Sequence, residues 1–246
     1  MNPLTAAELL AVWEHSLNKS QLEKAITLLA AACPEMDAEA IIQLPIGERD
    51  AMLLQLREWM FGSRLVNTAH CPQCTEPVEW ENRVADLSTP PKPDLNSSDA
   101  FHLKVSEYEL HFRLPDSNDI AAALKKNDDQ AARNGLLRRC ILEARHADRP
   151  CDIGSLPAAV LEKLSRRMEK LDPQAEIRME LTCPSCEHQW RILFDIISFL
   201  WADINRWAEN MILTIHELAR KYGWSETQIL ELSPVRRQMY LGLIRP

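Results

Sequence analysis

The sequence predicts an α+β fold that is mainly α-helical, with a small antiparallel β portion built around a split zinc ribbon. Leu, Ala and Glu are plentiful, and only six glycines occur among the 246 residues. Apolar residues recur at helical spacing in the first and last parts of the chain. Two Cys-Pro-Xaa-Cys motifs, at residues 71–74 and 183–186, lie instead between stretches with strand-like patterns.

The chain is expected to divide into three regions: an N-terminal helical region over residues 1–62, the split ribbon with its insertion over residues 63–194, and a C-terminal helical region over residues 195–246. The ribbon is split because its halves, residues 63–87 and 176–194, flank an inserted strand pair and helices over residues 100–172.

Three helices are predicted in the N-terminal region. Thr5 with Glu8, and Ser20 with Glu23, have the spacing of a capping box, which marks a helix start. The third helix covers about residues 46–62, and the glycine at its end is a plausible stop. Five of its apolar residues fall at helical spacing and are expected in the core: Met52, Leu53, Leu56, Trp59 and Met60.

The middle of the chain changes to extended patterns. Residues 64–87 alternate around the first cysteine motif, and the prolines and small polar residues of 88–99 predict an exposed loop or linker. Residues 101–105 and 108–114 alternate apolar and polar side chains, so they are expected to form a strand pair.

Helices are then predicted over residues 120–146, with a break near residues 126–130 or at Gly135, and over residues 156–171 after the cap Ser155. Residues 175–182 and 188–194 are strand candidates on either side of the second cysteine motif.

The longest helix is predicted over residues 195–222, about 40 Å at 1.5 Å per residue. Gly223 would end it, and two short helices would begin at Ser225 and Ser233. Its apolar residues repeat at three and four and predict a packing seam: Ile197, Leu200, Ile204, Trp207, Met211, Ile215 and Leu218.

The composition argues against several classes of protein. Hydrophobic residues make up 46% of the chain and charged residues 26%, which is ordinary for a soluble globular protein. The formal net charge of −8 weighs against a nucleic-acid partner, because nucleic-acid-binding proteins usually carry the opposite sign. No run of about 18 apolar residues predicts a membrane span. Seven cysteines without a visible secretory signal favour a reducing, cytoplasmic location.

The candidate metal ligands are Cys71, Cys74, Cys183 and Cys186. A tight turn lets the two sulfurs of each motif converge on one ion, and two such turns supply the four ligands of tetrahedral Zn²⁺. We expect one structural Zn²⁺ per chain, because a closed four-thiolate shell leaves no position for a catalytic water. A disulfide pair, two separate redox motifs and buried free thiols are the alternatives.

Other residues with chemical potential are expected to play structural roles. His70 and His188 flank the motifs and are expected to be exposed or to lie next to the ligands, although either could replace a cysteine. Cys33 and Cys140 fall within helical patterns and are expected in the core. Several large side chains near the C-terminus are also expected in the core, with a partner-binding surface as the alternative: Trp201, Trp207, Trp224, Tyr240 and Leu243.

Three segments together resemble a known family: "GERDAMLLQLREWMFG", "ELTCPSCEHQWRILFDIISFLW" and "HELARKYGWSETQILELSPVRRQMYLGLI". They are similar to the baseplate hub assembly chaperones and related baseplate proteins of T-even-type contractile-tailed phages, prophages and phage-like injection systems. The resemblance extends from about residue 45 onward, is most telling in the third segment, and leaves the first 44 residues unplaced.

The resemblance implies a non-enzymatic protein that helps to assemble a tail baseplate hub or forms part of it. Its expected partners are baseplate, hub or spike proteins, met in the cytoplasm of the bacterial host, and it could remain in the assembled tail particle. The absence of a nucleotide-binding glycine loop, HExxH and GxSxG agrees with a protein that is not an enzyme. The alternatives are a zinc-ribbon regulator or adaptor that touches nucleic acid, and an enzyme whose site leaves no sequence motif.

Overall fold

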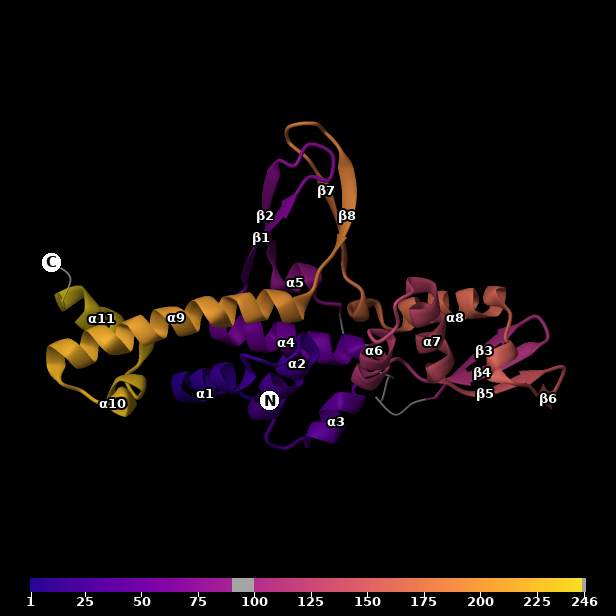
Figure 1. The fold of residues 1–246 in the computed structure, drawn as a ribbon, viewed down its shortest axis with the longest axis horizontal. Helices are drawn as coiled ribbons and strands as arrows, with labels where there is room; N and C mark the ends of the chain where they lie inside the picture. The colour runs from indigo at the N-terminus through magenta and orange to yellow at the C-terminus, as the bar shows by residue number, and fades with distance from the viewer. Residues whose placement is uncertain (90–99, 245–246) are drawn as a thin grey trace.

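The computed structural model describes residues 1–89 and 100–244. Figure 1 shows an elongated molecule with a helical body at its centre, from which two β-hairpins project side by side. An α/β lobe lies at one end of the long axis, and the C-terminal helices lie at the other. The loop predicted over residues 88–99 falls almost wholly outside the described residues.

The helical body begins with four helices: α1 (Ala6–Ser16), α2 (Gln21–Ala32), α3 (Ala38–Gln43) and α4 (Ile46–Phe61). Both predicted capping boxes are present. The side-chain oxygen of Thr5 accepts from the Glu8 amide, and that of Ser20 accepts from the Glu23 amide. The short helix α3 was not predicted from the sequence, and Asp37 caps it by accepting from the Ala40 amide at 2.7 Å.

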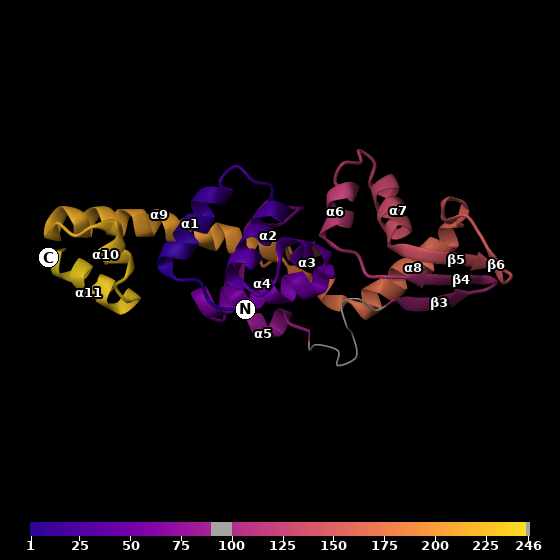
Figure 2. The ribbon, with the colours of Figure 1, turned by 90° about the horizontal axis from the view of Figure 1, so that it is seen from below.

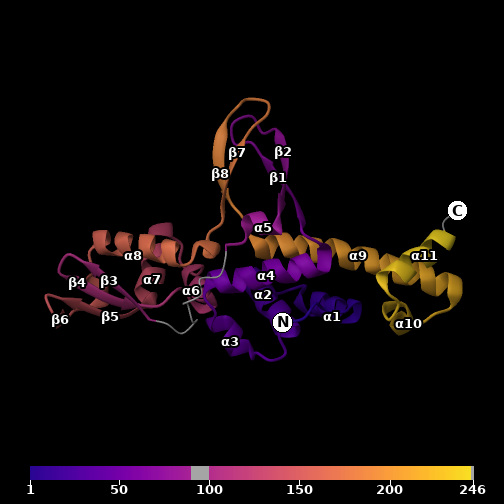
Figure 3. The same ribbon diagram turned by 180° about the vertical axis from the view of Figure 1, so that it is seen from behind.

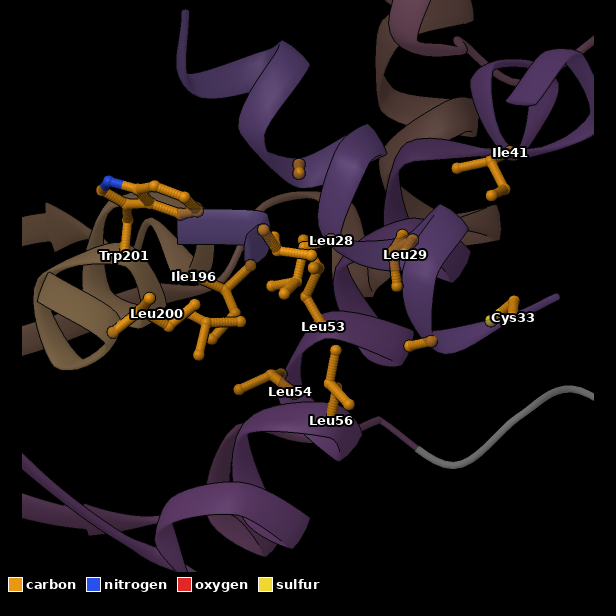
Figure 4. Packing of buried hydrophobic residues seen from close by; sticks show 14 of the residues in the cluster. Leu28, Leu29, Cys33, Ile41, Leu53, Leu54, Leu56, Ile196, Leu200 and Trp201 are labelled. Atoms are coloured by element: carbon orange, nitrogen blue, oxygen red, sulfur yellow. The ribbon is translucent and has the colours of Figure 1, made fainter. Parts of the chain in front are cut away.

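The core of the body forms where α2 and α4 pack against the first half of α9 (Ile196–Tyr222). Figure 4 shows Leu28, Leu53 and Leu200 among the side chains that meet there. Cys33, the residue that follows α2, is also buried in this cluster, which confirms its expected place in the core.

The core prediction for α4 is correct for most positions and wrong for Trp59. Leu53 and Leu56 are buried, whereas the Trp59 side chain is 46% exposed. Leu54 and Arg57 are also buried, so the buried face of α4 includes them. An α-helix turns about 100° per residue, so the side chain at position 59 points about 140° away from the centre of this buried face.

The two hairpins are separate two-stranded antiparallel sheets. β1 (Arg64–His70) pairs with β2 (Pro77–Arg83), and β7 (Arg178–Thr182) pairs with β8 (Gln189–Leu193). A short helix, α5 (Val84–Leu87), follows the first hairpin, and three buried residues of this segment, Leu65, Val84 and Leu87, join the core of the body.

The α/β lobe contains a four-stranded antiparallel sheet in the order β3–β4–β5–β6. Its elements are β3 (Phe101–Val105), β4 (Tyr108–Phe112), α6 (Ser117–Ala123), α7 (Asp129–Cys140), β5 (Ile141–His146), β6 (Arg149–Pro150), and α8 (Ala158–Leu171) with the single turns Ile153–Ser155 and Pro173–Ala175 on either side. Figures 1 and 3 both show α8 lying over one face of this sheet. Val160 and Leu164 of α8 share a buried cluster with Leu110 and Phe112 of β4.

The predicted helix over residues 120–146 is wrong at its end. It breaks between α6 and α7, near the predicted position, but Gly135 lies inside α7 and residues 141–146 form the strand β5. β5 pairs with β4 along its length, with Ala144 opposite Leu110. Pairing with a strand some thirty residues earlier outweighs the local helical pattern, because it buries Ile141 and Ala144 in the lobe core.

The long helix α9 ends at Gly223, whose φ of 71° is left-handed, as expected for a glycine stop. The first half of the predicted seam packs on the body, and the second half packs on α10 (Glu226–Leu230) and α11 (Pro234–Ile244), as Figure 2 also shows. Leu218, Ile229 and Leu241 are buried between these three helices.

The C-terminal aromatic residues largely pack inward, as expected. Trp201 is 5% exposed, and the rings of Trp224 and Tyr240 meet edge to face at 4.8 Å between centroids. Leu243 contradicts the expectation, because its side chain is 76% exposed on the outer face of α11. Within the described residues, no helix is long and apolar enough to cross a membrane.

Candidate metal centre

The four predicted cysteines meet at the tips of the two hairpins. Cys71 and Cys74 lie in the turn between β1 and β2, and Cys183 and Cys186 lie in the turn between β7 and β8. All four Sγ atoms lie within 4.8 Å of one another. Figure 3 shows the two turns side by side at the point farthest from the helical body.

The sulfur spacing fits a tetrahedral metal ion. Sγ of Cys71 lies 3.7 Å from Sγ of Cys186, and Sγ of Cys74 lies 3.5 Å from Sγ of Cys183. A regular tetrahedron with Zn–S bonds of about 2.3 Å has sulfur–sulfur edges of about 3.8 Å. Both short contacts join one hairpin to the other, so a bound ion would link the two halves of the chain.

The backbone of the first turn is folded tightly around its cysteines. The Cys71 amide donates to the Glu76 carbonyl at 2.9 Å, and the Thr75 amide donates to the Cys71 carbonyl at 2.9 Å. Thr75 has a φ of 62°, a left-handed conformation that reverses the chain after the second cysteine.

The second turn repeats this geometry at the matching positions. The Cys183 amide donates to the His188 carbonyl at 2.9 Å, the Glu187 amide donates to the Cys183 carbonyl at 3.0 Å, and Glu187 has a φ of 59°. Two hairpins that are distant in sequence therefore present their sulfurs from the same local backbone fold.

Backbone amides also prepare one thiol for ionisation. Burial raises the pKa of Cys183, but the amides of Cys186 and Ser185 donate to its sulfur and bring that pKa down to about 7. The Glu76 amide acts in the same direction on Cys74, yet the neighbouring thiols, beginning with Cys186, raise the pKa of Cys74 to about 12. Four sulfurs this close cannot all be thiolates without a cation between them, and a divalent metal ion would remove that obstacle.

A small apolar shell surrounds the sulfurs. Cys71 and Cys183 are buried, with Val78 against them and with Trp80 and Trp190 packed around the cluster. His188 stacks on Trp190 at 6.2 Å between ring centroids, and His70 is exposed. Neither histidine belongs to the group of converging ligand atoms, which agrees with their expected place beside the cluster.

The other cysteines stand apart from this group. Cys33 and Cys140 are buried, Cys151 is half-buried, and all seven cysteines are free thiols. Within the part of the chain that the structure describes, the only group of three or more candidate ligands already close enough to share a metal ion is the four-cysteine cluster.

The comparison with protein families decides where the chain belongs. A family model described as T4 bacteriophage base plate protein matches residues 3–201. The chain belongs to this base plate family. The matched segment holds both hairpins and all four clustered cysteines. No curated protein and no solved structure matches the chain.

The family match covers a different part of the chain from the resemblance predicted from the sequence motifs. The first 44 residues, which the sequence motifs left unplaced, lie inside the base plate family match apart from the first two. The segment expected to be most telling, from residue 216 onward, lies outside it. The match therefore follows the helical body, the hairpins and the inserted lobe, and it stops within the first quarter of α9.

Proposed function

We propose that this base plate family protein is a non-enzymatic, zinc-binding protein that acts in the assembly of a phage or phage-like contractile tail, as a hub assembly chaperone or as a baseplate component. The observation that carries the proposal is the family match over residues 3–201. A family of baseplate proteins implies contacts with other tail proteins. We place its work in the cytoplasm of the bacterial host, where tails are assembled, with baseplate, hub or spike proteins as its partners.

The zinc part of the proposal rests on the chemistry of the cluster. Cys71, Cys74, Cys183 and Cys186 would hold one Zn²⁺ through four thiolates, which closes the coordination shell. Such an ion supplies structure rather than catalysis. It would hold the two hairpins together across the inserted residues 100–172.

Metal analysis tests the zinc site. Protein purified without added metal is expected to carry about one zinc per chain, and Cys183→Ser is expected to lose most of it. Cys151→Ser is the matched control, because Cys151 is half-buried outside the cluster and its loss leaves all four proposed ligands in place. A metal-free wild type, or a disulfide within either cysteine pair, would refute the site.

Affinity purification tests the role in assembly. The tagged chain, recovered from its native host while tails are being built, is expected to bring baseplate, hub or spike proteins with it. Mass spectrometry of purified finished particles then separates the two forms of the proposal, since a component is retained and a chaperone is absent. Recovery of the chain without any tail protein, from cells that are assembling particles, would contradict both.

The regional division predicted from the sequence forms part of the proposal. In this view residues 1–62 and 195–246 are helical regions joined through α9, and residues 63–194 are the split ribbon with its insertion. The ribbon and the lobe would then be the parts most open to partners, because each projects from the helical body (Figure 1).

A further inference from the structure

A row of two histidines and a glutamate, residue types that can bind metal ions, crosses the sheet of the inserted lobe. His102 of β3 lies directly opposite His111 of β4, and His111 lies directly opposite Glu143 of β5. Directly opposite residues in antiparallel strands project their side chains from the same face, with Cβ atoms about 4.5–5.5 Å apart. The row therefore spans three adjacent strands on one face.

This face is the one that α8 leaves uncovered. The alternate residues of the same strands, among them Val105, Leu110 and Phe112, point into the lobe core beneath α8. His102 is exposed, and His111 and Glu143 are half-buried. A metal ion or another solute can reach the row from solvent without any rearrangement of the fold.

The two imidazoles are already in contact. Their ring centroids lie 3.6 Å apart at an interplanar angle of 63°. Among residues 1–89 and 100–244, no hydrogen bond to either imidazole accompanies this contact. The neighbouring charged groups on the same face are instead paired, Lys104 with Glu109 at 2.6 Å and Arg145 with Glu143 at 2.7 Å.

Glu143 is near enough to influence His111. The pKa of Glu143 is lowered, chiefly because Arg145 donates to its carboxylate and in part by the nearby His111. In the described structure its oxygens face Arg145, so the three ligand atoms have not yet converged. Binding through Glu143 therefore requires a rotation of this half-buried side chain away from Arg145 and toward the imidazoles.

We propose that His102 and His111, with Glu143 as third ligand, form a second metal site, for a divalent ion of the zinc, nickel or copper class. Neutral imidazole suits these ions, and two imidazoles with one carboxylate supply three ligands. Unlike the closed four-cysteine cluster, such a site keeps open coordination positions. A bound ion could thus take a further ligand from water or from a partner surface.

Calorimetric titration with Ni²⁺ tests the site on the full chain preloaded with zinc, so that the cysteine cluster is occupied. The wild type is expected to bind one Ni²⁺ per chain. His102→Asn and His111→Asn should each weaken binding by more than about tenfold, since even the outer partners of metal ligands are worth 10- to 100-fold. Glu143→Gln should weaken it less.

The matched control is His146→Asn. His146 lies on the same sheet but is stacked on Tyr108 and paired with Glu107 at 3.2 Å, so its loss should leave Ni²⁺ affinity unchanged. All of these positions are exposed or half-buried, and a thermal melt of each variant checks that the fold is intact. The proposal is overturned if the wild type binds no Ni²⁺ beyond the zinc-loaded cluster, or if the four variants bind it alike.

Discussion

Gly47 lies in the first turn of α4, where the backbone meets the carboxylate of Asp172, the residue that follows α8 of the inserted lobe. Its amide donates to Oδ2 of Asp172 at 2.9 Å. A Cβ at this position would lie 1.7 Å from Oδ1 of the same residue, so no side chain fits while that hydrogen bond is kept. One residue earlier, the Ile46 amide donates to the Pro115 carbonyl at 3.1 Å. The start of α4 is thus a contact between the helical body and the inserted lobe, which we call the body–lobe joint.

Gly47→Ala is expected to lower the free energy of unfolding by about 1–3 kcal/mol, as overpacking typically does. Gly135→Ala is the matched control, because Gly135 lies inside α7 with nothing within 4 Å of an added Cβ. That change should instead raise stability by about 0.5–1 kcal/mol through helix propensity. Urea unfolding of both variants is the measurement, and equal effects would contradict the close approach at Gly47.

Asp50 is a carboxylate beside Arg49, with a side chain that is 15% exposed and an ion-pair distance of 2.7 Å. Burial raises the pKa of Asp50 to about 6, although Arg49 pulls that pKa down. The Arg49 guanidinium also donates to Oγ of Ser117 at 3.2 Å, so it ties α4 to α6 of the lobe. The protonation of Asp50 therefore changes with pH at a contact between the helical body and the lobe.

The sign of the coupling follows from the proton balance. The pKa of Asp50 is higher in the folded state than the value of about 3.9 in the unfolded chain, so the folded state binds more protons between these values. The free energy of unfolding should therefore fall as pH rises from about 4 to about 6, by up to about 3 kcal/mol from this group. Urea unfolding across that range should show a smaller fall in Asp50→Asn. Identical pH dependence in the two proteins would contradict the assignment.

At the scale of elements, several helix ends follow local chemistry. The predicted cap Ser155 is wrong, because α8 begins after Pro157 without a side-chain cap hydrogen bond. The predicted caps of α1 and α2 and the glycine stop of α9 are all present, because a cap is satisfied by atoms within a few residues. The strand β5 shows the opposite case. Its residues fit a helix by pattern, and only pairing with β4 makes them a strand.

Gly223→Ala is expected to destabilise the C-terminal unit of α9, α10 and α11 by about 1–2 kcal/mol, because Ala must adopt a φ of 71°. Gly223→Asn should cost less, since Asn tolerates the left-handed conformation. Trp224 stacks on Tyr222 at 4.7 Å, and the difference in fluorescence between each protein and its Trp224→Phe counterpart isolates this residue among the seven tryptophans as a local readout during urea unfolding. Equal losses for Ala and Asn would argue that the conformation of Gly223 is not the cause.

At the scale of the whole molecule, the hairpin tips and the helical body are stabilised by different interactions. The body has an extensive core of leucines and isoleucines from α2, α4 and α9. The hairpin tips have few apolar contacts besides the cysteines, namely Val78, Trp80 and Trp190. The lobe has a third core of its own. The proposed zinc would thus stabilise the tips far more than the body.

If the proposed zinc is bound, its removal by a chelator is expected to separate the hairpin tips while most helical signal remains. Near-ultraviolet dichroism, sensitive to Trp80 and Trp190, should change strongly, and far-ultraviolet dichroism should change little. Returning one equivalent of zinc should restore the first signal. A cooperative loss of both signals on chelation would instead mean that the body depends on the ion.

Most of the fold class and the whole cysteine cluster could be predicted from the sequence. The twin motifs determine which four sulfurs are candidates, since thiolate chemistry and proximity within each turn are local. The exposed Trp59 and Leu243 could not be predicted, because burial on a helix depends on which neighbours cover it. Nor could the row from His102 to Glu143, since register across β3, β4 and β5 brings these residues together.

The sequence by itself determined the caps of α1 and α2, the glycine stop of α9, the two cysteine turns, and the resemblance to baseplate proteins. These depend on residue types at short spacing, whose interactions are complete within a turn or two of chain. Only the tertiary structure decided that residues 141–146 are a strand and that Gly47 lies against Asp172. Such contacts join residues far apart in the chain. They contribute to stability only after the fold has brought those residues together, so short-range sequence patterns do not reveal them.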